Sequence, residues 1–167
     1  MSTTSAADEP PTRPPAFVPG PGPASALAGP TQAALRLGYG GLIPFALGAL
    51  LVWLVREDAH PYVALGLAAY AAVIVSFLGG IHWGLAMRHA QPPTRLLVWG
   101  VVPPTLAWVA VLMPPSAGLV ILGLVLLACY GVDRRLYAEE GVAHWLTLRF
   151  RLSAVASLCC LVGAAGS

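Results

Sequence analysis

Residues 96–132 read LLVWGVVPPTLAWVAVLMPPSAGLVILGLVLLACYGV, thirty-seven residues without a formal charge between Arg95 and Asp133. A charged side chain at the centre of a bilayer costs at least about 2.5 kcal/mol, so lipid-embedded segments are depleted of charge. A single helix of this length would reach about 55 Å, nearly twice the ~30 Å of hydrocarbon that it has to cross. We therefore expect two spanning helices here, separated at Met113-Pro114-Pro115-Ser116.

The rest of the chain follows the same pattern. Apolar residues make up 57% of it and charged residues only 10%, with a mean hydropathy of +0.76. This composition predicts an all-α polytopic integral membrane protein, a bundle of about five transmembrane helices. Pro44 should kink the first helix, and Asp133–Ala143 should form a polar loop. The expected spans are 37–55, 62–87, 96–113, 117–132 and 145–165, within a domain over 33–167 that follows a disordered, Pro/Gly-rich tail over 1–32.

The arginines predict the orientation. If the N-terminus is inside, only Arg56 lies outside, which is a strong positive-inside bias. We expect an N-in/C-out multi-pass protein, most simply in a bacterial inner membrane. The eight arginines that fall inside are Arg13, Arg36, Arg88, Arg95, Arg134, Arg135, Arg149 and Arg151.

Small residues recur in the second span. Ser76, Gly80 and Gly84 are spaced by four, which places them on one helix face beside Gly79 and Trp83. Because close packing drives helix association in lipid, this face predicts a helix–helix contact more strongly than it predicts a ligand cleft.

The third span contains tandem prolines followed by a tryptophan. Pro103 and Pro104 free the carbonyls of Trp99 and Gly100, and Trp108 shares a face with Pro104. Local satisfaction of these carbonyls is the usual outcome in membrane helices. A pocket for a flat apolar ligand beside the kink is the alternative.

His82 is the one acidic or basic residue that falls inside an expected span apart from Arg149 and Arg151, which would lie near the first turns of the last span. His82 lies near the inner headgroups, and no acidic residue is expected to accompany it. We interpret it as a neutral interfacial histidine with a backbone or phosphate partner, and a proton relay is the alternative.

A basic cluster is expected at the inner face, with anionic lipid headgroups as its partner. An ion pair between Asp133 and Arg149 that holds the last helix is a further hypothesis. The three cysteines lack metal-ligand spacing, so no metal and no cofactor are expected. The cluster consists of Asp133, Arg134, Arg135, Arg149 and Arg151.

Several of these stretches together resemble one known family. They are LGYGGLIPF over 37–45, SFLGGIHWG over 76–84, the proline pair with Trp108, Asp133, and WLTLRFRLS over 145–153. The chain is similar to the small five-span membrane proteins related to eukaryotic transmembrane protein 69, whose bacterial members form a family of unknown function. Leu146, where the family pattern has an aromatic residue, and Pro103, where it has a small one, depart from that pattern. The resemblance implies a five-helix fold and no reaction.

Three classes of function remain at this stage. The first is a non-enzymatic accessory or assembly protein that binds lipid, a membrane protein partner or a second copy of itself. The second is a binder or carrier of a small apolar ligand, comparable in architecture to tryptophan-rich five-helix sensory proteins. An intramembrane enzyme ranks last, because no catalytic motif is present, and the weak net charge of +2 argues against a nucleic-acid partner.

Overall fold

The computed structural model describes residues 29–167, and within them every regular element is helical. Five helical segments are long and apolar enough to cross a membrane, which confirms the predicted all-α, five-span architecture. The expected disordered tail falls almost entirely on residues outside the described range, and Gln32 already belongs to the first helix. The elements are α1 (Gln32–Gly40), α2 (Ile43–Leu54), α3 (His60–Ala86), α4 (Thr94–Val111), α5 (Pro115–Glu139), the short 3₁₀ helix η2 (Ala143–Trp145) and α6 (Leu146–Ala165).

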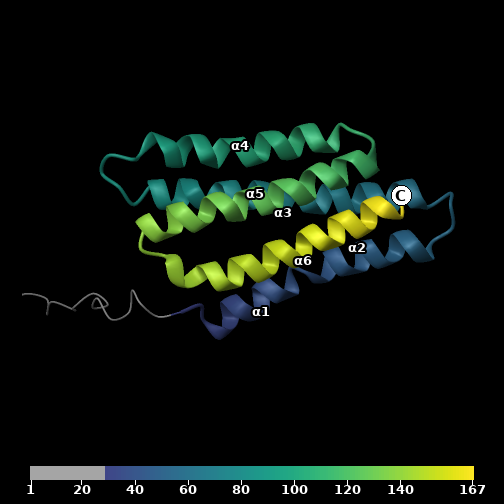
Figure 1. Ribbon diagram of the computed structural model, residues 1–167, viewed down its shortest axis with the longest axis horizontal. Coiled ribbons are helices and arrows are strands. Elements are labelled where there is room, and N and C mark those ends of the chain that lie inside the picture. The colour runs from purple at the N-terminus through teal and green to yellow at the C-terminus, as the bar shows by residue number, and fades with distance from the viewer. Residues whose placement is uncertain (1–28) are drawn as a thin grey trace, which may run out of the picture.

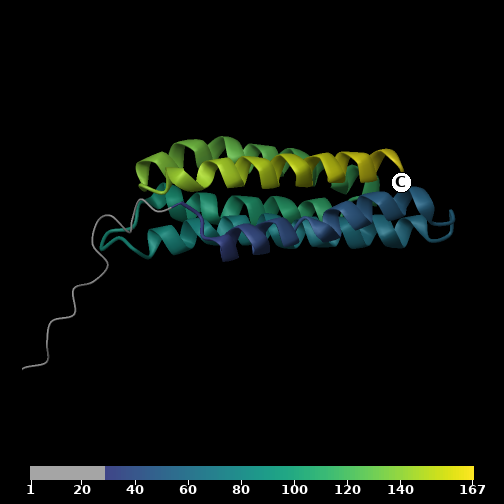
Figure 2. The same ribbon diagram turned by 90° about the horizontal axis from the view of Figure 1, so that it is seen from below.

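The helices form an antiparallel bundle (Figure 1), and the view from below shows α5 and α6 lying over α2, α3 and α4 (Figure 2). α3 is central, because it contacts α2, α4, α5 and α6. α1 packs mainly on α6. The start of α1, the α3–α4 turn and the α5–α6 turn lie at one end of the bundle (Figure 1). All the described arginines except Arg56 belong to these segments. We call this end the arginine-rich end.

The first span is broken between α1 and α2. α1 ends at Gly40, and Pro44 lies in the first turn of α2, where its missing N–H is tolerated. The kink expected at Pro44 therefore takes the form of a break just before it. The hydroxyl of Tyr70 on α3 donates to the carbonyl of Gly41 at 2.8 Å, which fixes the break against the bundle.

The prediction for the end of the fourth span was wrong. α5 does not stop at Val132 but continues to Glu139, and only the short segment before η2 remains as a loop. Gly141 in this loop has a φ of +72°, a conformation that glycine adopts without strain. Asp133 consequently lies about 9 Å inside the end of its helix, at ~1.5 Å per residue. Its charge is accommodated there because it faces the other helices.

The contact between α3 and α4 depends on two glycines. A Cβ atom on Gly79 would lie 2.6 Å from the carbonyl oxygen of Gly100 and 2.7 Å from Cδ of Pro104. Trp83 covers Gly100, and its Nε1 donates to the carbonyl of Leu97 at 3.2 Å. Four of the residues predicted to pack helices do so here. Gly79, Pro104 and Trp83 lie at the contact between α3 and α4, and Pro103 of α4 is buried in the bundle.

The predicted small-residue face behaves differently. Gly80 and Gly84 are exposed, and a Cβ atom on either would meet nothing within 4 Å. The hydroxyl of Ser76 bonds the carbonyl of Ala72 in its own helix at 2.8 Å. The prediction that these three residues pack another helix is therefore wrong within the described part of the chain. Periodicity identified a shared face but could not show which way it points.

Candidate ligand-binding site

Three charged or polar side chains meet inside the bundle near the arginine-rich end. Asp133 of α5 is 0% exposed, His82 of α3 is 1% exposed and Arg149 of α6 is 8% exposed. Arg149 donates through Nε to Oδ2 of Asp133 at 3.0 Å, and its Nη2 contacts the same oxygen. The ion pair between α5 and α6 that was hypothesised from the sequence is present.

His82 approaches the other carboxylate oxygen. Its Nε2 lies 3.0 Å from Oδ1 of Asp133, although the two groups are not aligned as a hydrogen bond. Its Nδ1 lies 3.1 Å from the carbonyl oxygen of Leu78, one turn earlier in α3. The ring of Tyr137 lies beside it, with 6.2 Å between the ring centroids. The side chains of three helices are thereby joined through one carboxylate.

These contacts correct two predictions. His82 has a backbone partner, the carbonyl of Leu78, as predicted, but it is buried rather than interfacial, and the unexpected carboxylate of Asp133 faces it. Asp133 and Arg149 do not lie on the surface of the bundle, where the predicted cluster would meet the headgroups of the surrounding bilayer, because they are buried against each other. Arg134, Arg135 and Arg151 are exposed at the same end, and Arg151 donates to the hydroxyl of Tyr39 at 3.3 Å. Charge spacing alone could not separate the buried arginine from the exposed ones.

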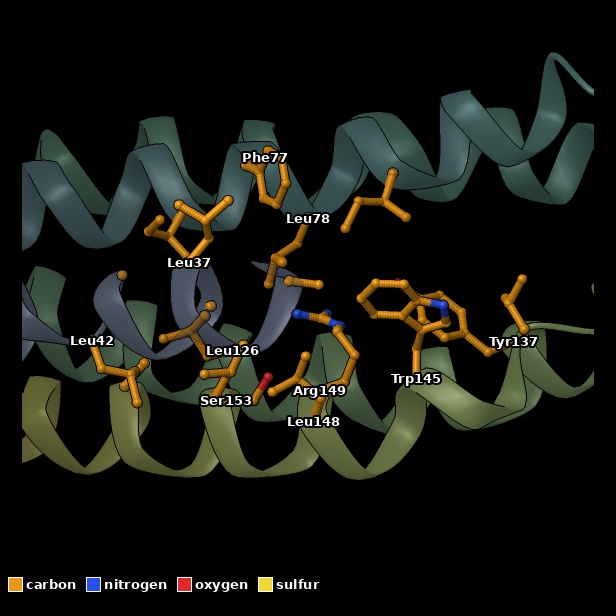
Figure 3. A pocket seen from close by; sticks show the side chains of 18 of the residues that line it. Leu37, Leu42, Phe77, Leu78, Leu126, Tyr137, Trp145, Leu148, Arg149 and Ser153 are labelled. Atoms are coloured by element: carbon orange, nitrogen blue, oxygen red, sulfur yellow. The ribbon is translucent and has the colours of Figure 1, made fainter. Parts of the chain in front are cut away.

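A cavity of about 540 Å³ borders this cluster (Figure 3). Its walls come from α1, α2, α3, α5, η2 and α6. Along α3 the lining extends from Ile74 to Leu85, which corresponds to about 16 Å at ~1.5 Å per residue. Nearly all of the lining is aliphatic or aromatic, so the cavity is elongated along the bundle and apolar for most of its length.

The cavity opens sideways, between α1 and α3. Leu37 of α1 and Phe77 of α3 line it and are nevertheless 78% and 64% exposed. Both belong to membrane-spanning segments. An apolar molecule in the surrounding bilayer can therefore reach the cavity by passing these two side chains.

Two of the polar groups of the cavity, Arg149 and Ser153, lie partway along it, and the lining continues past them to Trp145 and Val142. Figure 3 shows Arg149 and Ser153 extending from α6 into the lined space, with Tyr137 of α5 nearby. Ser153 is only 2% exposed, and its hydroxyl has no hydrogen-bond partner among the described residues. An unpaired buried hydroxyl is costly, so it marks a position where a ligand atom would be stabilised.

The sequence did not identify Ser153 or Tyr137. A signal was nevertheless present, because each follows a member of the buried pair by four residues: Tyr137 follows Asp133 and Ser153 follows Arg149. Residues four apart share a helix face, so both extend the face that the ion pair turns inward. Recognising them required knowing first that the pair is buried.

The pocket predicted beside the prolines of the third span is not where the cavity lies. Neither Pro103 nor Pro104 lines the cavity, and Trp108 is 64% exposed on the outside of the bundle. Of the five tryptophans, only Trp145 lines the cavity.

Comparison with known proteins agrees with this architecture. The model of a family described as a protein of unknown function (DUF3429) matches residues 30–165. The chain belongs to this family. This confirms the resemblance inferred from the sequence, and no solved structure matches the chain.

Two relatives carry the name transmembrane protein 69. The one from Xenopus tropicalis is 42% identical over 106 residues, covering 59% of this chain and 42% of that protein. The one from Mus musculus is 28% identical over 115 residues, covering 67% of this chain and 46% of that protein. The chain thus spans less than half the length of these relatives. Their names support a multi-pass integral membrane protein.

Proposed function

We propose that this protein is a non-enzymatic membrane protein that binds an amphiphilic lipid molecule in the cavity between α1, α3, α5 and α6. The observation that carries the proposal is the cavity itself, whose otherwise apolar walls include Arg149 and Ser153. Ligand sites of ~300–1,000 Å³ with apolar walls and a few converging polar groups are typical of small-molecule binding. The lateral opening supports a ligand that comes from the bilayer.

The cavity's shape supports a chain rather than a flat ring system. Its lining follows α3 for about three turns. The alternative, a flat apolar ligand held between tryptophans, relied on Trp108 and the prolines, none of which line the cavity. An acyl chain needs only the aliphatic walls that are present.

Filling the cavity should abolish binding while leaving the fold intact. We expect Ser153→Phe to place its ring in the existing space, so a fluorescent fatty-acid analogue should bind at least about tenfold more weakly. The measurement is a titration of the purified protein in mild detergent, with gel filtration to show that the variant remains folded.

Val155→Phe is the matched control, because Val155 lies on α6 but is 42% exposed and outside the cavity lining. It should bind the analogue as the parent protein does. If the parent protein does not bind any chain-bearing probe, or if both variants bind equally well, the cavity is not a ligand site.

For the membrane we propose a bacterial inner membrane with the arginine-rich end in the cytoplasm, as the arginine distribution supports. A reporter that fluoresces only in the cytoplasm should be active when inserted in the α3–α4 turn, between Met87 and Thr94, and inactive after Ser167. The same reporter inserted after Glu57 in the α2–α3 turn is the control and should be inactive. The reverse pattern of activity would overturn this orientation.

A further inference from the structure

We infer that the ligand's head is an anionic oxygen group, a carboxylate or a phosphate, bound by Arg149 and Ser153, with its single acyl chain in the apolar part of the cavity. This inference rests on the proposed function and adds the chemistry of the head. It follows from the hydrogen-bonding capacity and the charge of the polar groups that line the cavity.

The first step is the hydrogen-bonding capacity of the cavity's polar groups. Arginine has five N–H donors and no acceptor, and the contacts to Asp133 use Nε and Nη2. The guanidinium has further hydrogens, so it can donate both to the hydroxyl of Tyr137 and to an oxygen of a ligand in the cavity. The hydroxyl of Ser153 is buried one turn further along α6 and has no partner among the described residues. Two donors on the same face, one turn apart, suit an oxygen group with several lone pairs.

The second step is the charge that a ligand meets in the cavity. Arg149 lines the cavity, whereas Asp133 and His82 do not. A head group in the cavity therefore meets the positive member of the buried ion pair. Hydrogen bonds from a guanidinium to an anionic oxygen are stronger than those to a neutral oxygen.

The third step is the position of the cluster relative to the cavity and the bilayer. Arg149 is in the first turn of α6, with Trp145 and Val142 of the lining nearer the arginine-rich end, and the longer apolar part of the lining continues toward Leu42 and Phe45 near the start of α2. A chain that enters between Leu37 and Phe77 thus has its head at the membrane boundary and its tail toward the middle of the bundle. This is the orientation that an amphiphile already has in the bilayer.

The test compares probes that share one oleoyl chain and differ in the head. Oleate and lysophosphatidic acid are anionic, and oleyl alcohol and monooleoylglycerol are neutral. With the protein in detergent, we expect at least one anion to bind about tenfold or more tightly than both neutral probes, since charge-assisted bonds are about twice as strong as neutral ones. Which anion binds better distinguishes a free fatty acid from a phosphate headgroup.

The variants locate the preference. Asp133→Asn combined with Arg149→Gln keeps a polar pair of similar size but removes the charges, and the preference for anions should disappear. Arg135→Gln removes one positive charge from an exposed position at the same end and should leave the preference unchanged. Ser153→Ala should weaken oleate binding several-fold. It tests the same head position if the double variant does not fold.

The outcomes separate the two proposals. If all four probes bind equally well to the parent protein, the anionic head is excluded and the lipid-binding function stands. If none of them binds, the proposed function itself fails. If Arg135→Gln removes the preference as strongly as the double variant does, the preference arises from the surface and the assignment to Arg149 is wrong.

Discussion

Replacing Arg149 with leucine is expected to lower the free energy of unfolding by about 3–5 kcal/mol, the cost of leaving one partner of a buried ion pair uncompensated. The carboxylate of Asp133 is fully buried, and the arginine supplies both of its aligned hydrogen bonds among the described residues. Without them, the charge would face only His82. The loss is measured as equilibrium unfolding in mixed micelles of increasing denaturing-detergent fraction.

Two further variants make this prediction specific. Asp133→Leu combined with Arg149→Leu removes both charges and should recover most of the lost stability, because well-packed apolar replacements of a buried pair are often neutral or stabilising. Arg134→Leu removes an exposed arginine from the same helix and should leave the unfolding transition in place. If the double variant is as unstable as Arg149→Leu, packing of the arginine stem rather than its charge would explain the loss.

The bundle could be predicted from the sequence because its signal is the absence of charge over whole segments. A stretch such as residues 96–132 has few alternatives to crossing the membrane, and the proline pair at Pro114 and Pro115 shows where it turns. The end of α5 could not be predicted in the same way. Asp133, Arg134 and Arg135 read as a polar boundary, because a sequence does not show that one of the three charges turns inward to a partner sixteen residues later.

The site was predictable only in fragments. His82, Asp133 and Arg149 were each identified, but as separate residues at the membrane boundary, and only the Asp133–Arg149 pair was hypothesised. Bringing His82 to them requires the packing of α3 against both α5 and α6, which is a tertiary property. The cavity depends on the break at Gly41 and on α1 lying against α6. A hydropathy pattern describes the length of a span and not the space left beside it.

The contact between α3 and α4 gives a prediction in which two adjacent glycines have opposite effects. Gly79→Ala is expected to cost about 1–3 kcal/mol, because the added methyl group would overlap the backbone carbonyl of Gly100 and the ring of Pro104, and neither can move aside by changing rotamer. Gly80→Ala meets open space and should be neutral or stabilising by up to about 1 kcal/mol through helix propensity. Thermal unfolding of the two variants in the same detergent measures the difference.

Gly84→Ala extends the control, because Gly84 lies one turn beyond Gly80 on the same exposed face and should behave as Gly80 does. The two helices have to separate to admit a methyl group at Gly79, and Trp83, which covers Gly100, would then lose its hydrogen bond to Leu97. A blue or red shift in tryptophan emission should therefore accompany the loss of stability in Gly79→Ala alone. Equal destabilisation by all three substitutions would mean that the exposed face of α3 is covered in the folded protein, contrary to the helix arrangement described above.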